Sequence, residues 1–298
     1  MALPRVTYLE EGEVSEPVTW LRIHCFVNRH TSRDHFMAAS SKETKSVFEK
    51  IPNVKHVEPT MQTDSDEFEK VVRSRRSTRV YSDDPVPESV MRKCLELAML
   101  APNSSNLQCW EFYWVRDATK KQELVKLCLG QPAAATAQEL IVCVARLDTW
   151  KRNSKLVLEH LIANEADVPA AKLNYQRKIV PMAYGHGPFY VLGPLKKLLI
   201  ATLGLFKVVP RGPASKADMR VWAHKTTALA CQNLMLAFRA FGFDSCPMEG
   251  MDERRVQKLL GLPRSAEVCM VISAGKRAKH GIYDKQFRCD RSLFVFEV

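Results

Sequence analysis

A long helical pattern runs from Ala217 to Phe241 and stops at Gly242. Glycine directly after the last apolar residue is a common helix stop, because it adopts a left-handed backbone without strain. The apolar residues of this helix form a wide stripe. Such a stripe needs burial on more than one side, so we expect the helix in a deep core or at a subunit interface. The apolar residues that form it at helical spacing are Val221, Trp222, Ala228, Leu229, Leu234, Met235, Phe238 and Phe241.

Two apolar runs, residues 140–145 and 268–274, predict strands that are covered on both faces of a sheet. A third strand is predicted at residues 110–115, and residues 244–250 are expected to form a loop. Helical spacing and capping residues predict further helices that begin at Asp66, span residues 88–100 and 117–129, lie near residues 156–166, and follow Asp252.

The chain of 298 residues is long enough for one or two domains with a buried core. Residues 1–62 show no sustained periodicity and end in a polar stretch, so we interpret them as an N-terminal extension. Residues 63–298 then form the main domain. Within it, residues 150–216 include a stretch rich in glycine and proline, which we interpret as a lid or insertion that covers a site or an interface.

The formal net charge of +11 indicates an anionic partner, and its distribution along the chain narrows the choice. Residues 1–60 are balanced, whereas residues 73–79 carry +4, residues 177–217 carry +7 with no acidic residue, and residues 276–291 carry +4. Proteins that bind nucleic acid usually spread basic residues over a face, with aromatic residues where the strand is single. Three short clusters differ from that pattern, so we expect no nucleic-acid partner.

Cysteine and histidine spacing predicts neither a disulfide framework nor a metal site. The nine cysteines are odd in number and contain no C-x-x-C pair, and the eight histidines lack the spacing of metal ligands. The N-terminus lacks the apolar core of a signal peptide, so a cytoplasmic location is expected.

The most apolar stretch, residues 191–209, is interrupted by three lysines and is too short to cross a bilayer. Lysines beside leucine, isoleucine and phenylalanine nevertheless suit a helix that lies on a membrane surface. A peripheral membrane contact through residues 188–209 therefore stays open beside the simpler interpretation, a hydrophobic lid or subunit-interface helix.

Four short segments have residues suited to chemistry: 75–79, 102–110, 247–250 and the basic tail that contains Arg291. The first brings three guanidinium groups and two hydroxyls within five residues, a combination that suits a phosphate monoester. A solvated basic turn would have the same local pattern.

In this order the four segments resemble the FMN-dependent nitroreductase family. The family motif R-R/H-S-x-R/K corresponds to residues 75–79, and A-P-S-x-x-N-x-Q-P-W corresponds to residues 101–110. The family's long helix corresponds to residues 230–243, P-x-E-G to 247–250, and L-G-L-P to 260–263. The resemblance covers roughly residues 66–298 of this sequence.

The resemblance implies an α+β nitroreductase-like fold, with a central, mainly antiparallel sheet flanked by helices. It also implies an intertwined homodimer that binds FMN at two sites in its interface. Arg75, Ser77 and Arg291 would bind the FMN phosphate and ribityl chain, and Arg79 would lie near the pyrimidine edge of the flavin. The full set of implied cofactor-binding residues is Arg75, Arg76, Ser77, Arg79, Asn103, Ser105, Asn106, Pro247, Met248, Glu249, Gly250, Arg288 and Arg291.

This sequence departs from the family pattern at three positions. Asn103 stands where the family has serine, Cys109 where it has proline, and Cys289 where it has lysine, whose place Arg288 would take. The segment 150–216 corresponds to the family's substrate-covering helices. Its candidates for substrate contacts are Tyr184, His186, Phe189 and Tyr190.

The expected function is that of an NAD(P)H-dependent FMN oxidoreductase, which reduces nitroaromatic, quinone or related acceptors in a ping-pong, two-electron cycle. No catalytic side chain is assigned, since hydride transfer between stacked rings depends on proximity. One alternative is a specialised reductase of the same fold, such as a reductive dehalogenase. Another is a flavoprotein that acts on a lipid-soluble quinone at a membrane surface.

Overall fold

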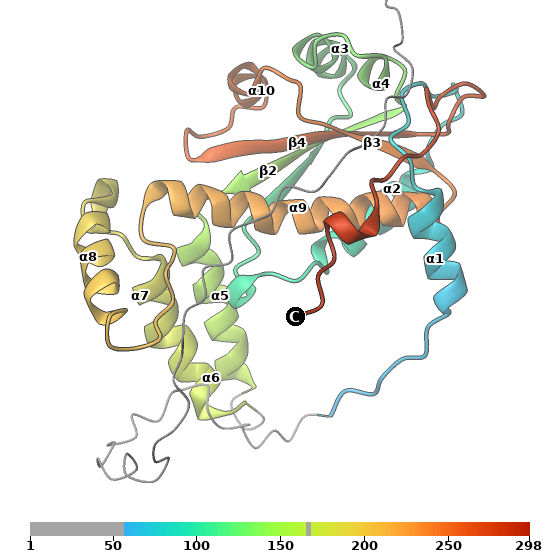
Figure 1. Cartoon of the computed structure of the whole chain (residues 1–298). Coiled ribbons are helices and arrows are strands. Elements are labelled where there is room, and N and C mark those ends of the chain that lie inside the picture. Colours follow the sequence, from blue (N-terminus) through green and yellow to red (C-terminus); the bar gives the residue numbers. More distant parts are fainter. Residues whose placement is uncertain (1–56, 165–167) are drawn as a thin grey trace, which may run out of the picture. The chain divides into compact units, whose positions relative to one another are not determined.

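A four-stranded antiparallel sheet is the central element of the computed structural model, which describes residues 57–164 and 168–298 (Figure 1). The described residues belong to one unit, residues 50–298. Most of the predicted N-terminal extension lies outside the described residues, so its boundary at residue 62 stays a prediction. The strand order is β1–β2–β4–β3, with β1 at Trp110–Trp114, β2 at Glu139–Arg146, β4 at Ala266–Gly275 and β3 at Asp244–Met248.

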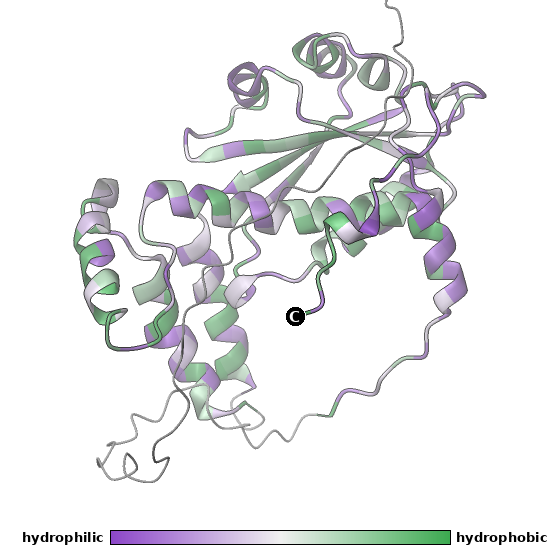
Figure 2. Ribbon diagram, in the orientation of Figure 1, coloured by the Kyte–Doolittle hydropathy of each residue, from purple (hydrophilic) through white to green (hydrophobic). Residues whose placement is uncertain are grey.

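The two central strands are buried because apolar residues point to both faces of the sheet. In β2, Leu140 and Val142 belong to the core on one face, and Ile141 and Cys143 to the core on the other. β4 pairs along the whole length of β2. Figure 2 shows both strands as predominantly hydrophobic. The two strands predicted from apolar runs are thereby confirmed, with ends that differ by at most two residues.

Helices cover both faces of the sheet, which confirms the predicted α+β class (Figure 1). One face packs against α9 (Lys216–Ala240) and α2 (Glu88–Met99). The other face packs against α3 (Ala118–Leu127), α4 (Pro132–Ala135) and α10 (Glu253–Leu259).

The long helix α9 agrees with the predicted helix to within one residue at each end. Its cap is Ser215, whose Oγ accepts the N–H of Asp218 at 3.2 Å. Phe238 is fully buried against the sheet, whereas Val221 and Leu229 stay exposed. The described part of this chain therefore covers only part of the apolar stripe of α9.

The segment between β2 and α9 contains most of the helices that lie at the N-terminal end of α9 (Figure 1). Its side chains pack on α9 mainly through aromatic rings: Tyr184 lies 4.7 Å from Trp222 between ring centroids. The opposite end of α9 contacts α1 (Ser65–Ser74). The elements of the segment are α5 (Trp150–Ala163), α6 (Ala170–Asn174), the π-helix η3 (Tyr175–Ile179), α7 (Val180–Tyr184), the 3-10 helix η4 (Pro188–Tyr190) and α8 (Gly193–Leu203).

The expectation of a loop at residues 244–250 is wrong, because β3 occupies Asp244–Met248. Its polar residues and Pro247 hide the strand pattern. Proline donates no ladder hydrogen bond, but β3 is the edge strand of the described sheet. Its outer side meets the chain in an isolated bridge between Ser245 and Ser77, two residues before Pro247, so the missing donor costs little.

One further correction concerns a helix of the segment 150–216. The helix expected near residues 156–166 begins earlier, at Trp150. The glycine- and proline-rich stretch contains the helices α7 and α8, each with a proline in its first two positions, Pro181 and Pro194. At the start of α8 the missing N–H of Pro194 has no intrahelical partner to lose, so this proline suits the helix start. Pro181 instead lies directly after the π-helix η3, because Ile179 has helical backbone angles.

Candidate functional site

A polar pocket of about 320 Å³ brings together Arg75, Arg76, Ser77, Arg79 and Arg288. The first four of these residues directly follow helix α1. Asp64 caps the start of α1 by accepting the N–H groups of Asp66 and Glu67 at 2.9 and 3.0 Å, and the helix ends at Ser74, after which the chain is extended. The structure thus groups five of the predicted cofactor-binding residues from two distant parts of the chain.

Backbone hydrogen bonds hold the arginine segment in place. Thr78 N donates to Ser245 O of β3 at 3.2 Å, and Arg79 N donates to Gly281 O at 2.6 Å. The Arg76 guanidinium donates to the carbonyl of Asp284 at 2.5 Å. Gly281 is required here, since a Cβ at this position would lie 2.3 Å from the carbonyl oxygen of Val80.

The charge of this pocket is strongly positive. Lys285 adds a fifth basic side chain to the four arginines, and Asp284 is the single acidic residue of the lining. The ion pairs among the described residues involve other arginines, such as Arg73 with Glu69. The hydroxyls of Thr78 and Ser245, on the segments that frame the pocket, are buried with no hydrogen-bond partner in the described structure. Guanidinium groups that have no carboxylate partner among the described residues fit a bound phosphate.

Cys246 lies beside this arginine segment but is poorly suited to act as a nucleophile. Burial raises the pKa of its thiol, and Arg79, a hydrogen bond with Ser77, and Arg75 offset only part of that rise. The thiolate is the nucleophilic form, so a raised pKa keeps this group inert near neutral pH.

The predicted 247–250 segment follows directly from β3. Pro247 and Met248 are the last residues of the strand, and Glu249 and Gly250 are exposed after it. Gln131 Nε2 donates to Gly250 O at 2.8 Å, which ties the exposed turn to the start of α4. A Cβ at Gly250 would lie 3.2 Å from that amide nitrogen.

The predicted residues Asn103, Ser105 and Asn106 lie at the short helix η1 (Ser104–Asn106). Ser105 and Asn106 have positive φ values of 58° and 54°. Ser105 Oγ lies 2.7 Å from the hydroxyl of Tyr175, and Ser104 Oγ lies 2.8 Å from that of Tyr184. The helices of the segment 150–216 therefore support this loop.

The predicted cofactor residues form two separate groups in one chain. The η1 group borders a pocket of about 650 Å³ that is lined by Trp222, Thr226 and Leu229 of α9. The arginine group instead contacts Ser245, just after α9 ends at Ala240. At about 1.5 Å of rise per residue, the α9 residues of this pocket lie about 16–27 Å along the helix from Ala240. Arg291 begins the 3-10 helix η5 (Arg291–Leu293) and does not belong to the arginine pocket lining.

The predicted substrate residues are largely committed to internal contacts. Tyr184 and His186 are each only 4% exposed. The ring nitrogens of His186 lie 2.9 Å from Tyr184 O and 3.1 Å from Pro213 O. Tyr190 stacks loosely on His186, with ring centroids 5.5 Å apart. The side chain of Phe189 lies outside the described residues.

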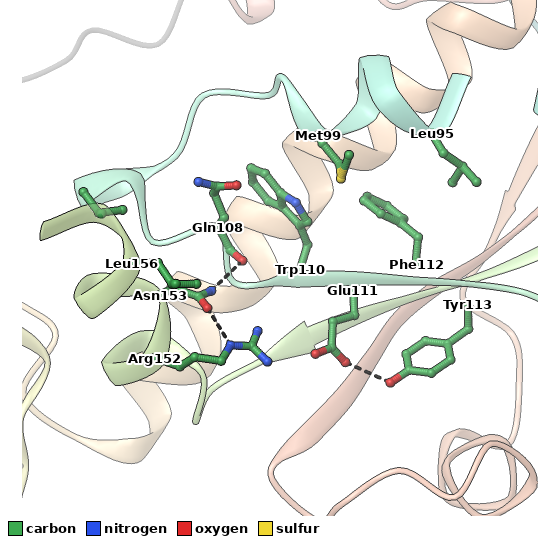
Figure 3. A pocket seen from close by; sticks show the side chains of 11 residues that line it. Leu95, Met99, Gln108, Trp110, Glu111, Phe112, Tyr113, Arg152, Asn153 and Leu156 are labelled. Atoms are coloured by element: carbon green, nitrogen blue, oxygen red, sulfur yellow. Dashed lines mark hydrogen bonds between the residues drawn. The ribbon is translucent and has the colours of Figure 1, made fainter. Parts of the chain in front are cut away.

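The sequence analysis did not single out a third pocket, of about 640 Å³, along the outer edge of β1 (Figure 3). Trp110 and Phe112 face Met99 of α2, while Glu111 and Tyr113 point to the other side and join through a 2.9 Å hydrogen bond. Arg146 pairs with Glu111 at 2.6 Å. The signal that was overlooked is the run of large residues W-E-F-Y-W in a strand that lies at the edge of the sheet formed by the described residues.

The family model named Nitroreductase family matches residues 72–276. The chain belongs to the nitroreductase family. It is similar to the NADH dehydrogenase of Thermus thermophilus, with 28% identity over 207 residues that cover 70% of this chain and 85% of that protein. It is also similar to the protein DrgA of Synechocystis, with 26% identity over 214 residues that cover 72% and 85%.

Solved structures of this family share the fold. YdfN of Bacillus subtilis aligns with a TM-score of 0.65 at 21% identity over 79% of this chain and 100% of that one. A structure from Exiguobacterium sibiricum in complex with FMN aligns with a TM-score of 0.57 at 22% identity over 80% and 100%. This nitroreductase-family protein is accordingly an oxidoreductase with the predicted fold.

The matched region of this nitroreductase-family protein contains the arginine segment, the η1 loop and the 247–250 turn, whereas Arg288 and Arg291 lie beyond it. Within residues 57–164 and 168–298, no cluster of histidine, cysteine or carboxylate side chains has the geometry to hold a metal ion. In the same part of the chain, no helix is both long and apolar enough to span a membrane.

Proposed function

We propose that this chain is an FMN-dependent oxidoreductase that uses NAD(P)H to reduce nitroaromatic, quinone or related acceptors in two-electron, ping-pong cycles. The observation that carries the proposal is the arginine pocket, in which Arg75, Arg79 and Arg288 have no carboxylate partner among the described residues. This pocket lies in a chain of the nitroreductase family. Bound FMN would supply the hydride acceptor and donor.

The chain's own residues would bind and orient the cofactor. Arg75 and Ser77, with Arg288, would hold the phosphate through charge-assisted hydrogen bonds. Arg76 already donates to Asp284 O and would fix the opposite wall of the pocket. Arg79 would set positive charge beside the pyrimidine edge of the flavin, which favours the reduced form. The exposed turn at Glu249 and Gly250 would approach the ring through its backbone.

The chemistry requires no dedicated acid, base or nucleophile from the protein. Hydride is transferred when the donor and then the acceptor stack on the same ring. The rate enhancement then comes from holding the two reacting rings close together. The raised pKa of Cys246 and the exposure of Glu249 are consistent with that assignment.

A homodimer would bring the two groups of cofactor residues together. One chain separates its arginine pocket from its η1 loop along α9, whereas a two-fold dimer can place the pocket of one protomer against the loop of its partner. The exposed side chains of Val221 and Leu229 on α9, and of Phe294 and Phe296 in the tail, offer apolar surface for such an interface.

The proposal is tested by the cofactor content of the purified protein. We expect a yellow protein with the absorbance of oxidised flavin, which NADH or NADPH bleaches in the absence of oxygen and a nitroaromatic or quinone restores. Parallel double-reciprocal plots would support the ping-pong order. A colourless protein that takes up no FMN on incubation contradicts the proposal.

A specialised reductase of the same fold is the second candidate. The observation that favours it is the aromatic wall of the 650 Å³ pocket, where Tyr184 and Trp222 suit an aromatic acceptor of defined shape. Turnover of halotyrosines beside nitroaromatics distinguishes the two. A preference for the halogenated substrate, with halide release, supports the specialised reductase.

A further inference from the structure

The segment 191–211 exposes large apolar side chains beside basic ones. Leu198 of α8 is 63% exposed, and Phe206 in the following turn is 84% exposed. Figure 2 shows hydrophobic and hydrophilic residues mixed over α8. The exposed large apolar residues of this segment are Val191, Leu192, Leu195, Leu198, Leu199, Leu203, Leu205, Phe206 and Val208. We call this surface, with Lys197 and Lys207, the α8 face.

Only one side of α8 is attached to the rest of the domain. Gly193 packs closely there, since a Cβ at this position would lie 3.0 Å from Ala214 O. Lys196 lies on the same side and donates a hydrogen bond to Ala183 O of α7. Leu195, Leu198 and Leu199 follow the i, i+3, i+4 spacing of a single face and stay exposed. Folding of the domain thus leaves these three leucines in water.

Both the size and the charge of the α8 face are unusual. Monomeric proteins seldom leave so many neighbouring apolar side chains exposed unless the surface binds something. The ion pairs of the described residues involve none of the cations between residues 177 and 217, and the first acidic residue after them is Asp218, which accepts the N–H of Ala214 at 2.9 Å. The cations of this segment are Arg177, Lys178, Lys196, Lys197, Lys207, Arg211 and Lys216.

We infer that the α8 face docks on an anionic phospholipid membrane. α8 would lie in the plane of the interface, with Leu198, Leu199 and Phe206 among the acyl chains and with Lys197 and Lys207 against lipid phosphates. At 11 residues, α8 is far too short to cross the bilayer. The inference does not depend on the proposed flavin chemistry.

Charge favours a lipid surface over a second copy of this chain. A two-fold contact through the α8 face brings the same patch of both subunits together, so it would oppose Lys197 and Lys207 with the same two cations of the partner. Phospholipid headgroups supply the missing negative charge, and their acyl chains accept the leucines. Apolar insertion and basic attraction together provide the two contributions that stable peripheral binding requires.

Vesicle co-sedimentation of the full-length, flavin-loaded protein tests the inference. We expect binding to vesicles of equal parts phosphatidylcholine and phosphatidylserine, weaker binding as salt is raised, and little binding to phosphatidylcholine alone. Changing Lys197→Glu with Lys207→Glu should weaken binding to the anionic vesicles by at least about 30-fold. Lys196 is left unchanged, because its hydrogen bond to Ala183 O holds α8 in place.

The matched control reverses two exposed cations of α10, Arg254→Glu with Lys258→Glu, which changes the net charge equally. Vesicle binding by this control should stay within a few-fold of the parent. If both variants lose vesicle binding equally, the loss depends on the net charge of the protein and not on the α8 face, and the inference is wrong.

A second pair of changes, Leu198→Ser with Phe206→Ser, tests the apolar contribution and should also abolish binding. Sedimentation velocity of the same variant distinguishes a membrane from a second copy of this chain as the partner of the α8 face. If the parent does not bind vesicles and this variant changes from dimer to monomer, the α8 face is a subunit interface and the inference is wrong. Thermal unfolding of each variant checks that the protein remains folded.

Discussion

Two regions of this protein carry an excess of positive charge, and their surroundings differ. The arginines at 75–79 line a polar pocket with hydroxyls and backbone groups around them, on segments that hydrogen bond to β3. Lys197 of α8 and Lys207 just after it lie among exposed leucines and Phe206, and α8 is attached along one side. The same charge therefore suits different partners: a small anion in a polar pocket, and an extended anionic surface beside apolar side chains.

The difference also concerns how each region is held. Backbone hydrogen bonds from Thr78 to Ser245 of β3 and from Arg79 to Gly281 hold the arginine segment in place. α8 has few contacts with the domain, so its surface can adjust to a partner without disturbing the sheet. Charge alone gives no indication of this contrast, whereas burial and hydrogen bonding define it.

The largest effect is expected for the double change Arg75→Ala with Ser77→Ala. Loss of two charge-assisted contacts to phosphate should cost about 3–6 kcal/mol, or roughly 10²- to 10⁴-fold in FMN affinity. Fluorescence titration of the apoprotein with FMN measures it. Arg73→Ala is the matched control, since Arg73 pairs with Glu69 outside the pocket and should leave affinity unchanged. An affinity within a few-fold of the parent in the double variant would remove the phosphate assignment.

A slightly smaller effect is expected for Phe238→Ala, which tests the rigid side of the comparison. Phe238 is fully buried between α9 and the sheet, so truncation should lower the free energy of unfolding by about 3–5 kcal/mol. Chemical denaturation followed by circular dichroism gives the value. A loss below about 1 kcal/mol would mean that this core adjusts as readily as α8 does.

An intermediate effect is expected where α9 joins the sheet between the two regions. Glu267 of β4 accepts from Arg220 at 2.7 Å and lies 3.0 Å from His224 Nε2. Burial raises the pKa of Glu267, but Arg220 and His224 together outweigh it and lower the pKa below its ordinary value. Glu267→Gln should therefore lower the free energy of unfolding by about 1–2 kcal/mol at neutral pH. The loss is kept modest because Arg220 is partly exposed to solvent, which screens its ion pair.

The pH dependence of that loss has a defined sign. A carboxylate with a lowered pKa stabilises the fold above its unfolded pKa, and this contribution disappears as the pH falls through the folded value. The difference between Glu267→Gln and the parent should accordingly shrink in acid. His224 provides a second measurement: its hydrogen bond with Cys269 raises its pKa, burial opposes the rise, and Glu267 adds to it. Titration by NMR should show a lower pKa for His224 in the variant, and an unchanged value would contradict the contact.

The smallest effect is expected for Leu198→Ala on α8. Because this side chain is mostly exposed, the free energy of unfolding should change by no more than about 0.5 kcal/mol. Thermal or chemical unfolding in the absence of lipid is the measurement. A loss comparable to that of Phe238→Ala would place α8 within the cooperative core and abolish the contrast between the two regions.

Much of the fold follows from local patterns in the sequence. The long helix, the two central strands and the cap at Asp252 depend on periodicity and on the chemistry of single residues, and the structure confirms them. β3 was missed because its pattern is polar and contains Pro247, and its strand identity comes from pairing with β4. A helix within residues 188–209 was expected from lysines beside leucine, isoleucine and phenylalanine, and the structure has α8 at Gly193–Leu203, with Pro194 in its first turn.

The candidate site was predictable residue by residue but not in its arrangement. The arginine segment and the η1 loop are short motifs, and the family resemblance that they carry is confirmed by the match over residues 72–276. Their separation along α9 depends on packing between elements far apart in the chain, which no local pattern encodes. The roles of Arg75, Asn106 and the other site residues toward FMN stay predictions.

The helix α9 fixes both the distance and the angle between the η1 loop and the arginine pocket. Inserting one residue between Leu229 and Ala240 would move everything beyond it by about 1.5 Å and rotate it by about 100° about the helix axis. Substitutions on this stretch can be absorbed by repacking, but a change in its length would disturb the spacing and the phase at once. α9 is thus a spacer of fixed phase, and point changes should be accommodated in it far more readily than insertions or deletions.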